Sequence, residues 1–151
     1  MNKLQVCLAA MLISGAAALA VDYPEFTQWM KYHDQAASAL RKMEQKTGPQ
    51  AVRAAEYMAT VNELMIGFFR QHGDRKTVKL AEDGKAAATA LMNAASAKDA
   101  AGADAAFKTL SGTCQPCHEQ YRERDADGKY HFKFQAERRP QPAAPKPAPA
   151  K

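Results

Sequence analysis

The chain has 151 residues, which is enough for one domain. Its formal net charge is +5, but the positive charge is unevenly distributed. Residues 21–124 carry 14 basic and 13 acidic side chains, whereas residues 125–151 carry six basic and three acidic ones. A nearly neutral body without a basic stripe and interleaved aromatic residues argues against a nucleic-acid-binding domain.

Residues 1–20 have the pattern of a secretory signal peptide. Lys3 supplies the positive start, residues 4–13 are mostly apolar, and Ala18-Leu19-Ala20 fits a cleavage site. We therefore predict export to the periplasm, cleavage after about Ala20, and no membrane span in the mature chain. A retained membrane anchor is the alternative, although the apolar stretch is short for one. Cys7 is removed with the signal.

The body of the chain has four stretches in which apolar residues recur every three or four positions, the spacing of amphipathic helices. They cover about residues 23–43, 50–70, 74–97 and 99–124. Gly48-Pro49 is expected to end the first helix, and Asp99 to cap the fourth. For the third helix we predict a core face of Leu80, Ala87, Ala90, Leu91 and Ala94. Four helices of this length with short connections predict an all-α, antiparallel four-helix bundle over residues 21–124.

The helical pattern stops after Arg124. Residues 129–134 alternate aromatic and polar side chains, which predicts a short extended segment lying on the bundle. Residues 140–151 contain five prolines with Ala and Lys. This composition predicts that residues 125–151 form an extended or disordered tail, with a basic docking arm as the alternative.

The run Cys114-Gln115-Pro116-Cys117-His118 carries the chemistry of the chain. In a Cys-x-x-Cys-His motif each thiol can add across one vinyl group of a haem, and the adjacent imidazole can bind the iron. A zinc site would need four ligands, usually with a second Cys or His pair, and the chain has no such pair. A thioredoxin-like pair would need a preceding strand. We therefore predict one covalently bound haem c, with His118 as the proximal axial ligand.

A four-helix bundle with this motif on its last helix resembles the class II cytochromes c, which comprise cytochrome c prime and its low-spin relatives. The resemblance covers about residues 22–124. It rests on the ending from Cys114 to Arg122, which fits C-x-x-C-H-x-x-[FY]-R, and on Trp29-Met30-Lys31 in the first helix. Many members carry Arg-Gln in the turn before that methionine, whereas this chain has Phe26-Thr27-Gln28.

The resemblance implies that Met30 is the distal axial ligand, because low-spin members supply a methionine from this part of the first helix. A core methionine without an iron bond is the alternative for Met30. His33 lies on the same helix face and is the alternative distal ligand. Arg122, one turn after His118, is a candidate partner for a haem propionate, with a solvated helix face as its alternative. The family also leaves a homodimer open.

The sixth ligand determines the expected function. A thioether raises the reduction potential and closes the iron to gases, which suits transfer of single electrons between redox protein partners. An apolar distal side would leave a five-coordinate iron that binds NO or CO. A peroxidase-like enzyme would need a distal acid–base histidine, for which His33 is the candidate. We predict an electron carrier rather than an enzyme.

Overall fold

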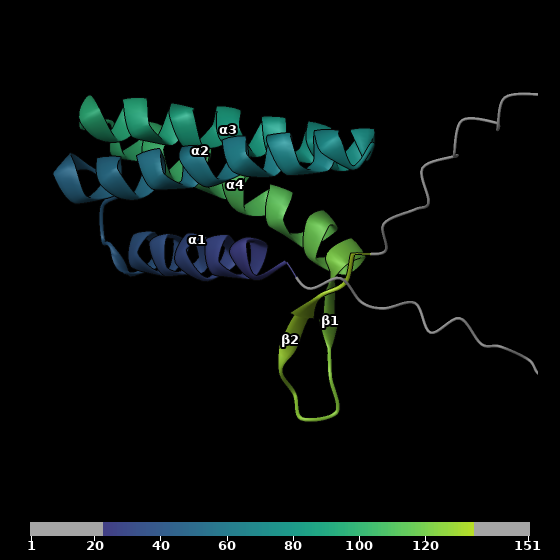
Figure 1. Ribbon diagram of the computed structural model, residues 1–151. Helices are drawn as coiled ribbons and strands as arrows, with labels where there is room; N and C mark the ends of the chain where they lie inside the picture. Colours follow the sequence, from purple (N-terminus) through teal and green to yellow (C-terminus); the bar gives the residue numbers. More distant parts are fainter. Residues whose placement is uncertain (1–22, 135–151) are drawn as a thin grey trace, which may run out of the picture.

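The computed structural model describes residues 23–134, which form four helices followed by a two-stranded hairpin (Figure 1). The predicted signal peptide, Cys7 and the proline-rich segment 140–151 lie outside the described residues. The helices and strands are α1 (Pro24–Lys42), α2 (Gly48–Gln71), α3 (Arg75–Ser96), α4 (Ala100–Tyr121), β1 (Arg122–Arg124) and β2 (Tyr130–Phe132). The predicted four-helix bundle is confirmed.

Local sequence signals explain where the helices begin. Gly48 and Pro49 begin α2 rather than end α1, since proline suits the first helical turn, where its missing N–H is not needed. Asp74 caps α3 by accepting a hydrogen bond from the Thr77 amide at 3.0 Å. Asp99 caps α4 in the same way, with the Gly102 amide as the donor, so the predicted cap is confirmed.

The core consists of two groups of buried side chains at opposite ends of the bundle. One group packs Leu40, Met58, Leu91 and Leu110 with a set of small alanines. The other gathers aromatic and large aliphatic residues around Phe26 and Phe69. In α3, Ala87 and Leu91 are buried as predicted, but Ala90 is exposed and Ala88 takes its place. The buried face of α3 is thus rotated slightly from the predicted one.

The helix-bearing part of the chain ends earlier than predicted. α4 stops at Tyr121, and residues 122–124 are the first strand of a hairpin instead of the last helical turn. The strands are antiparallel, with Arg122 opposite Phe132 and Arg124 opposite Tyr130. Residues 130–132 are the extended segment expected after Arg124, and they contact α1. No helix within residues 23–134 is long and apolar enough to cross a membrane.

Candidate haem site

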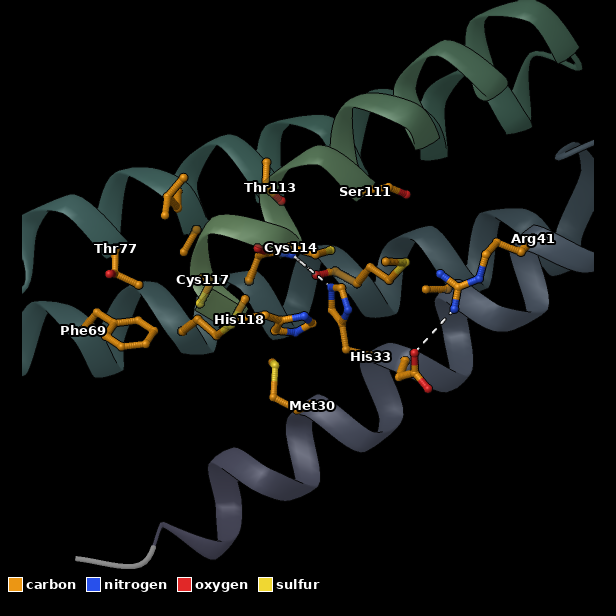
Figure 2. A pocket seen from close by; sticks show the side chains of 17 residues that line it. Met30, His33, Arg41, Phe69, Thr77, Ser111, Thr113, Cys114, Cys117 and His118 are labelled. Atoms are coloured by element: carbon orange, nitrogen blue, oxygen red, sulfur yellow. Dashed lines mark hydrogen bonds and ion pairs between the residues drawn. The ribbon is translucent and has the colours of Figure 1, made fainter. Parts of the chain in front are cut away.

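The structure brings the motif residues and the first-helix candidates to one cavity of about 250 Å³ between the helices. Cys114, Cys117 and His118 line it from α4, and Met30 and His33 line it from α1. Figure 2 shows the Met30 side chain extending from α1 toward the His118 ring, with His33 beside them. Residues more than 80 positions apart in the sequence therefore line the same cavity.

α4 continues through the motif without interruption, although Pro116 lies between the two cysteines. Proline cannot donate the helical hydrogen bond to the carbonyl four residues earlier, so the backbone is less constrained there. Cys114 and Cys117 are both free thiols and both partly buried. Burial raises the pKa of Cys114, and burial and the nearby Cys114 raise the pKa of Cys117 to about 11. Both sulfurs are therefore protonated at neutral pH.

The two histidines of the cavity are held as neutral imidazoles. Burial, followed by the proximity of His118, lowers the pKa of His33 from 6.5 to about 4, against a smaller opposing effect of Asp34. Burial and the nearby Arg122 guanidinium lower the pKa of His118. A neutral imidazole is the form that binds iron, so both side chains have the protonation state of a ligand.

Asn62 is a polar residue of the cavity that we did not single out from the sequence. It is 3% exposed, and its side-chain amide donates to the Met58 carbonyl at 2.8 Å. The same amide nitrogen lies 3.5 Å from Nε2 of His33. Gly84 in α3 makes room for it, since a Cβ atom at this position would collide with the Asn62 side chain. Asn62 could have been recognised from the sequence as a polar residue on the otherwise apolar face of the second helix.

Arg41 is a second residue of the cavity that was not predicted from the sequence. It lies two helical turns after His33 on the same face of α1, and this spacing was the available signal. Its guanidinium forms an ion pair with Asp34 at 3.4 Å, and both side chains line the cavity (Figure 2). Arg122, the predicted propionate partner, does not line this cavity, and its guanidinium stacks on the exposed Tyr130 ring at 4.3 Å.

A second cavity, of about 290 Å³, adjoins the first and shares Met30, Cys117 and His118 with it. Its remaining wall includes Arg122 and Phe132 from the hairpin. The site therefore extends from the space between the helices to the hairpin, and Arg122 faces this outer part.

The side chains present fit a haem c. Two thiols separated by two residues and an adjacent imidazole are the groups that attach and ligate such a haem. Methionine, alanine, leucine and phenylalanine side chains supply an apolar wall, namely Ala37, Met58, Met65, Phe69, Leu80 and Ala81. Within residues 23–134 no group of three His, Cys, Asp or Glu side chains could hold a metal ion by itself. The described part of the chain thus contains no ready zinc site.

Comparison with known proteins agrees with this site. Residues 71–122, which span α3 and α4 with the whole motif, match the family model of cytochrome c′. No curated protein and no solved structure matches the chain. The family is built on a four-helix bundle, as is this chain, and it implies haem c as the cofactor. The similarity over residues 71–122 supports a c-type cytochrome and is consistent with the class II family, to which cytochrome c′ belongs.

Proposed function

We propose that this chain is a periplasmic monohaem cytochrome that carries single electrons between redox protein partners and is not an enzyme. Cys114 and Cys117 would hold the haem through thioether bonds, and His118 would bind the iron on the proximal side. When bound, the haem supplies an iron that cycles between the ferric and ferrous states. The protein supplies the ligands, the apolar surroundings and the charges that set the reduction potential.

The observation that supports the proposal is that the Met30 side chain extends toward the His118 ring (Figure 2). Both side chains line both cavities of the site, although they come from the first and the last helix. A thioether on the distal side stabilises ferrous iron and leaves no open coordination position. Both effects suit electron transfer, because a closed iron neither binds diatomic gases nor admits peroxide.

The polar residues of the cavity support Met30 over His33 as the distal ligand. The side-chain amide nitrogen of Asn62 can only donate, so its contact with His33 occupies the Nε2 lone pair that iron binding would require. Met30 makes no such competing interaction among those the structure records. Arg41 is the cation best placed in the inner cavity to pair with a haem propionate, and Arg122 remains a candidate partner at the outer cavity.

A pair of matched variants tests the assignment. Met30→Leu and Met65→Leu each remove one thioether from the inner cavity at similar side-chain volume. We expect Met65→Leu to keep a six-coordinate low-spin ferric spectrum. This spectrum includes a weak absorption band at the red end of the visible range, here called the red band, which marks a thioether–iron bond. We expect Met30→Leu to lose that band and become high-spin. If Met30→Leu leaves the spectrum and the reduction potential unchanged, Met30 is not the ligand and the proposal fails.

A carbon monoxide binding experiment distinguishes the proposed electron-transfer function from the alternative gas-binding function. The ferrous wild-type protein should show no shift of its Soret band in CO, and ferrous Met30→Leu should show one. A shift in the wild-type protein would replace our proposal with the alternative, a five-coordinate protein that binds NO or CO.

Export and attachment have their own test. Expression of the full chain with a periplasmic haem-attachment system should yield a protein whose N-terminus is Val21 and whose mass includes one haem after denaturation. Cys114→Ala should retain the haem through one thioether, and the double variant with Cys117→Ala should release it. An intact N-terminus would indicate a retained anchor instead.

A further inference from the structure

The hairpin connects the two helices that carry the proposed axial ligands. β1 follows α4 directly at Arg122, and β2 contacts α1. Apart from these strands, the main partner of α1 is α2 and that of α4 is α3. Figure 1 shows the hairpin at the end of the bundle where α4 diverges from the other helices, beside the start of α1. It is therefore the bridge between α1 and α4 at the haem end.

Phe132 makes the central contact of this bridge. Its ring stacks on Phe26 of α1, with ring centroids 3.9 Å apart and planes inclined by 18°. Phe26 is 3% exposed and lies one helical turn before Met30, on the same face of α1. Fixing Phe26 therefore fixes the turn of α1 from which the Met30 side chain projects.

Lys133 and Phe134, which follow β2, are held by a backbone hydrogen bond and by ring contacts. The Lys133 amide donates to the Tyr121 carbonyl of α4 at 2.6 Å. The Phe134 ring contacts Tyr121 of α4, Phe68 of α2 and His72, which follows α2, with centroid distances of 5.8, 5.5 and 4.7 Å. Residues 132–134 are thus tied to the last helix by the backbone and to the first two helices by their rings.

The turn of the hairpin is also held in one conformation. The Asp125 carboxylate accepts from the Lys129 amide at 2.7 Å and pairs with His131 at 2.6 Å. Gly128 has a φ of +79°, which other residues rarely adopt, and its carbonyl accepts from Arg124. A fixed turn makes the hairpin a bridge of fixed length rather than a loose loop.

We propose that Phe132, supported by Phe134, is a positioning residue that holds the start of α1 so that the Met30 thioether stays at the haem iron. Phe132 also lines the outer cavity together with Met30 and His118, so its ring reaches the site itself. The inference rests on the proposed ligation by Met30. Without the ring on Phe26, the first turns of α1 can move away from α4, which opens the distal side.

The test uses the full-length, haem-loaded Phe132→Ala variant. We expect loss of the weak red band of the thioether–iron bond, a high-spin ferric spectrum, and a CO-dependent Soret shift in the ferrous protein. The haem should stay covalently bound, because the motif is unchanged. Phe132→Leu, which restores part of the apolar volume, should regain most of the band. Glu123→Ala, an exposed change in the same hairpin, should match the wild type.

A second control separates positioning from general loss of stability. Leu91 is fully buried in the other core group, so Leu91→Ala should lower the melting temperature at least as much as Phe132→Ala. We expect the folded Leu91→Ala protein to keep the red band. Loss of the band in this variant as well would overturn the positioning role, since ligation would then merely follow stability.

The outcome for Met30→Leu distinguishes the two proposals. If Met30→Leu changes the spectrum but Phe132→Ala does not, the positioning role is wrong and the ligand assignment stands. If Met30→Leu changes nothing, the ligand assignment is wrong and the positioning role falls with it.

Discussion

Asn62 of α2 and His33 of α1 meet at the inner cavity, where the side-chain amide nitrogen of Asn62 lies 3.5 Å from Nε2 of the imidazole. Asn62 is almost fully buried, and the same nitrogen also donates to the Met58 carbonyl at 2.8 Å. The amide is therefore held in a fixed position from which it engages the His33 lone pair. This contact restrains His33, the alternative to Met30 as the distal ligand in our proposal.

We predict that Asn62→Leu weakens this restraint and allows His33 to compete for the iron. Part of the protein should then lose the red band while remaining low-spin, and the reduction potential should fall, because a second imidazole favours ferric iron more than a thioether does. Visible spectra and a redox titration measure both effects. Adding His33→Leu should restore the band, and a double variant that stays without it would rule out competition by His33.

Gly84 provides a test of how closely α2 and α3 pack behind the site. A Cβ atom at this position would collide with Oδ1 of Asn62 and would approach Thr113 Oγ1 to 3.2 Å. Gly84→Ala should therefore reduce the free energy of unfolding by roughly 1–2 kcal/mol, because overpacking outweighs the better helix propensity of alanine. Urea unfolding of the haem-loaded protein measures the change.

Gly67 is the matched control for Gly84. It also lies inside a helix, but a Cβ atom there would have no neighbour within 4 Å. Gly67→Ala should raise the free energy of unfolding by about 0.5–1 kcal/mol through helix propensity alone. Equal effects of the two substitutions would show that the contact between Gly84 and Asn62 does not constrain the bundle.

The parts of the fold that depend on local signals were predictable from the sequence. The three-four spacing predicted four helices, and Asp99 marked the start of α4 because a cap depends on residues a few positions apart. The spacing of the motif placed Cys114, Cys117 and His118 on one helix, and the structure shows all three at the same cavity. The match to cytochrome c′ covers this region.

The parts that depend on long-range contacts were not predictable. Arg122 to Arg124 continue the helical pattern, but these residues pair with β2 instead, because Phe132 gains buried ring contacts with Phe26 by doing so. The role of Asn62 likewise depends on a glycine in another helix, which no local pattern reveals. The assignment of Met30 as the ligand stays a prediction.

Arg41 should influence the reduction potential of the haem. Its guanidinium lines the inner cavity, and its positive charge repels ferric iron more strongly than ferrous iron. Arg41 therefore favours the ferrous state. We predict that Arg41→Gln lowers the potential by roughly tens of millivolts, with a smaller effect at high salt, since the side chain is half exposed. Arg53→Gln, an exposed change on α2 outside both cavities, should have no comparable effect. Equal shifts for the two variants would indicate a general charge effect.

The lowered pKa of His33 predicts an acid-sensitive fold in the haem-free protein. Unfolded chains take up a proton at this imidazole near pH 6.5, whereas the folded protein does so only near pH 4. Between these values the unfolded state binds more protons, so the free energy of unfolding falls as the pH decreases, and the loss levels off below about pH 4.

Haem-free protein carrying Cys114→Ser and Cys117→Ser is the sample for this measurement. Between about pH 7.5 and about pH 5, proton uptake at His33 in the unfolded state should lower the free energy of unfolding by about 2 kcal/mol. The lowered pKa of His118 should lower it further. Urea unfolding at several pH values gives the slope. His33→Gln, which cannot titrate but can still accept from Asn62, should remove most of it. A slope unchanged by His33→Gln would mean that His33 is not buried as a neutral imidazole, and that the contact with Asn62 does not restrain it.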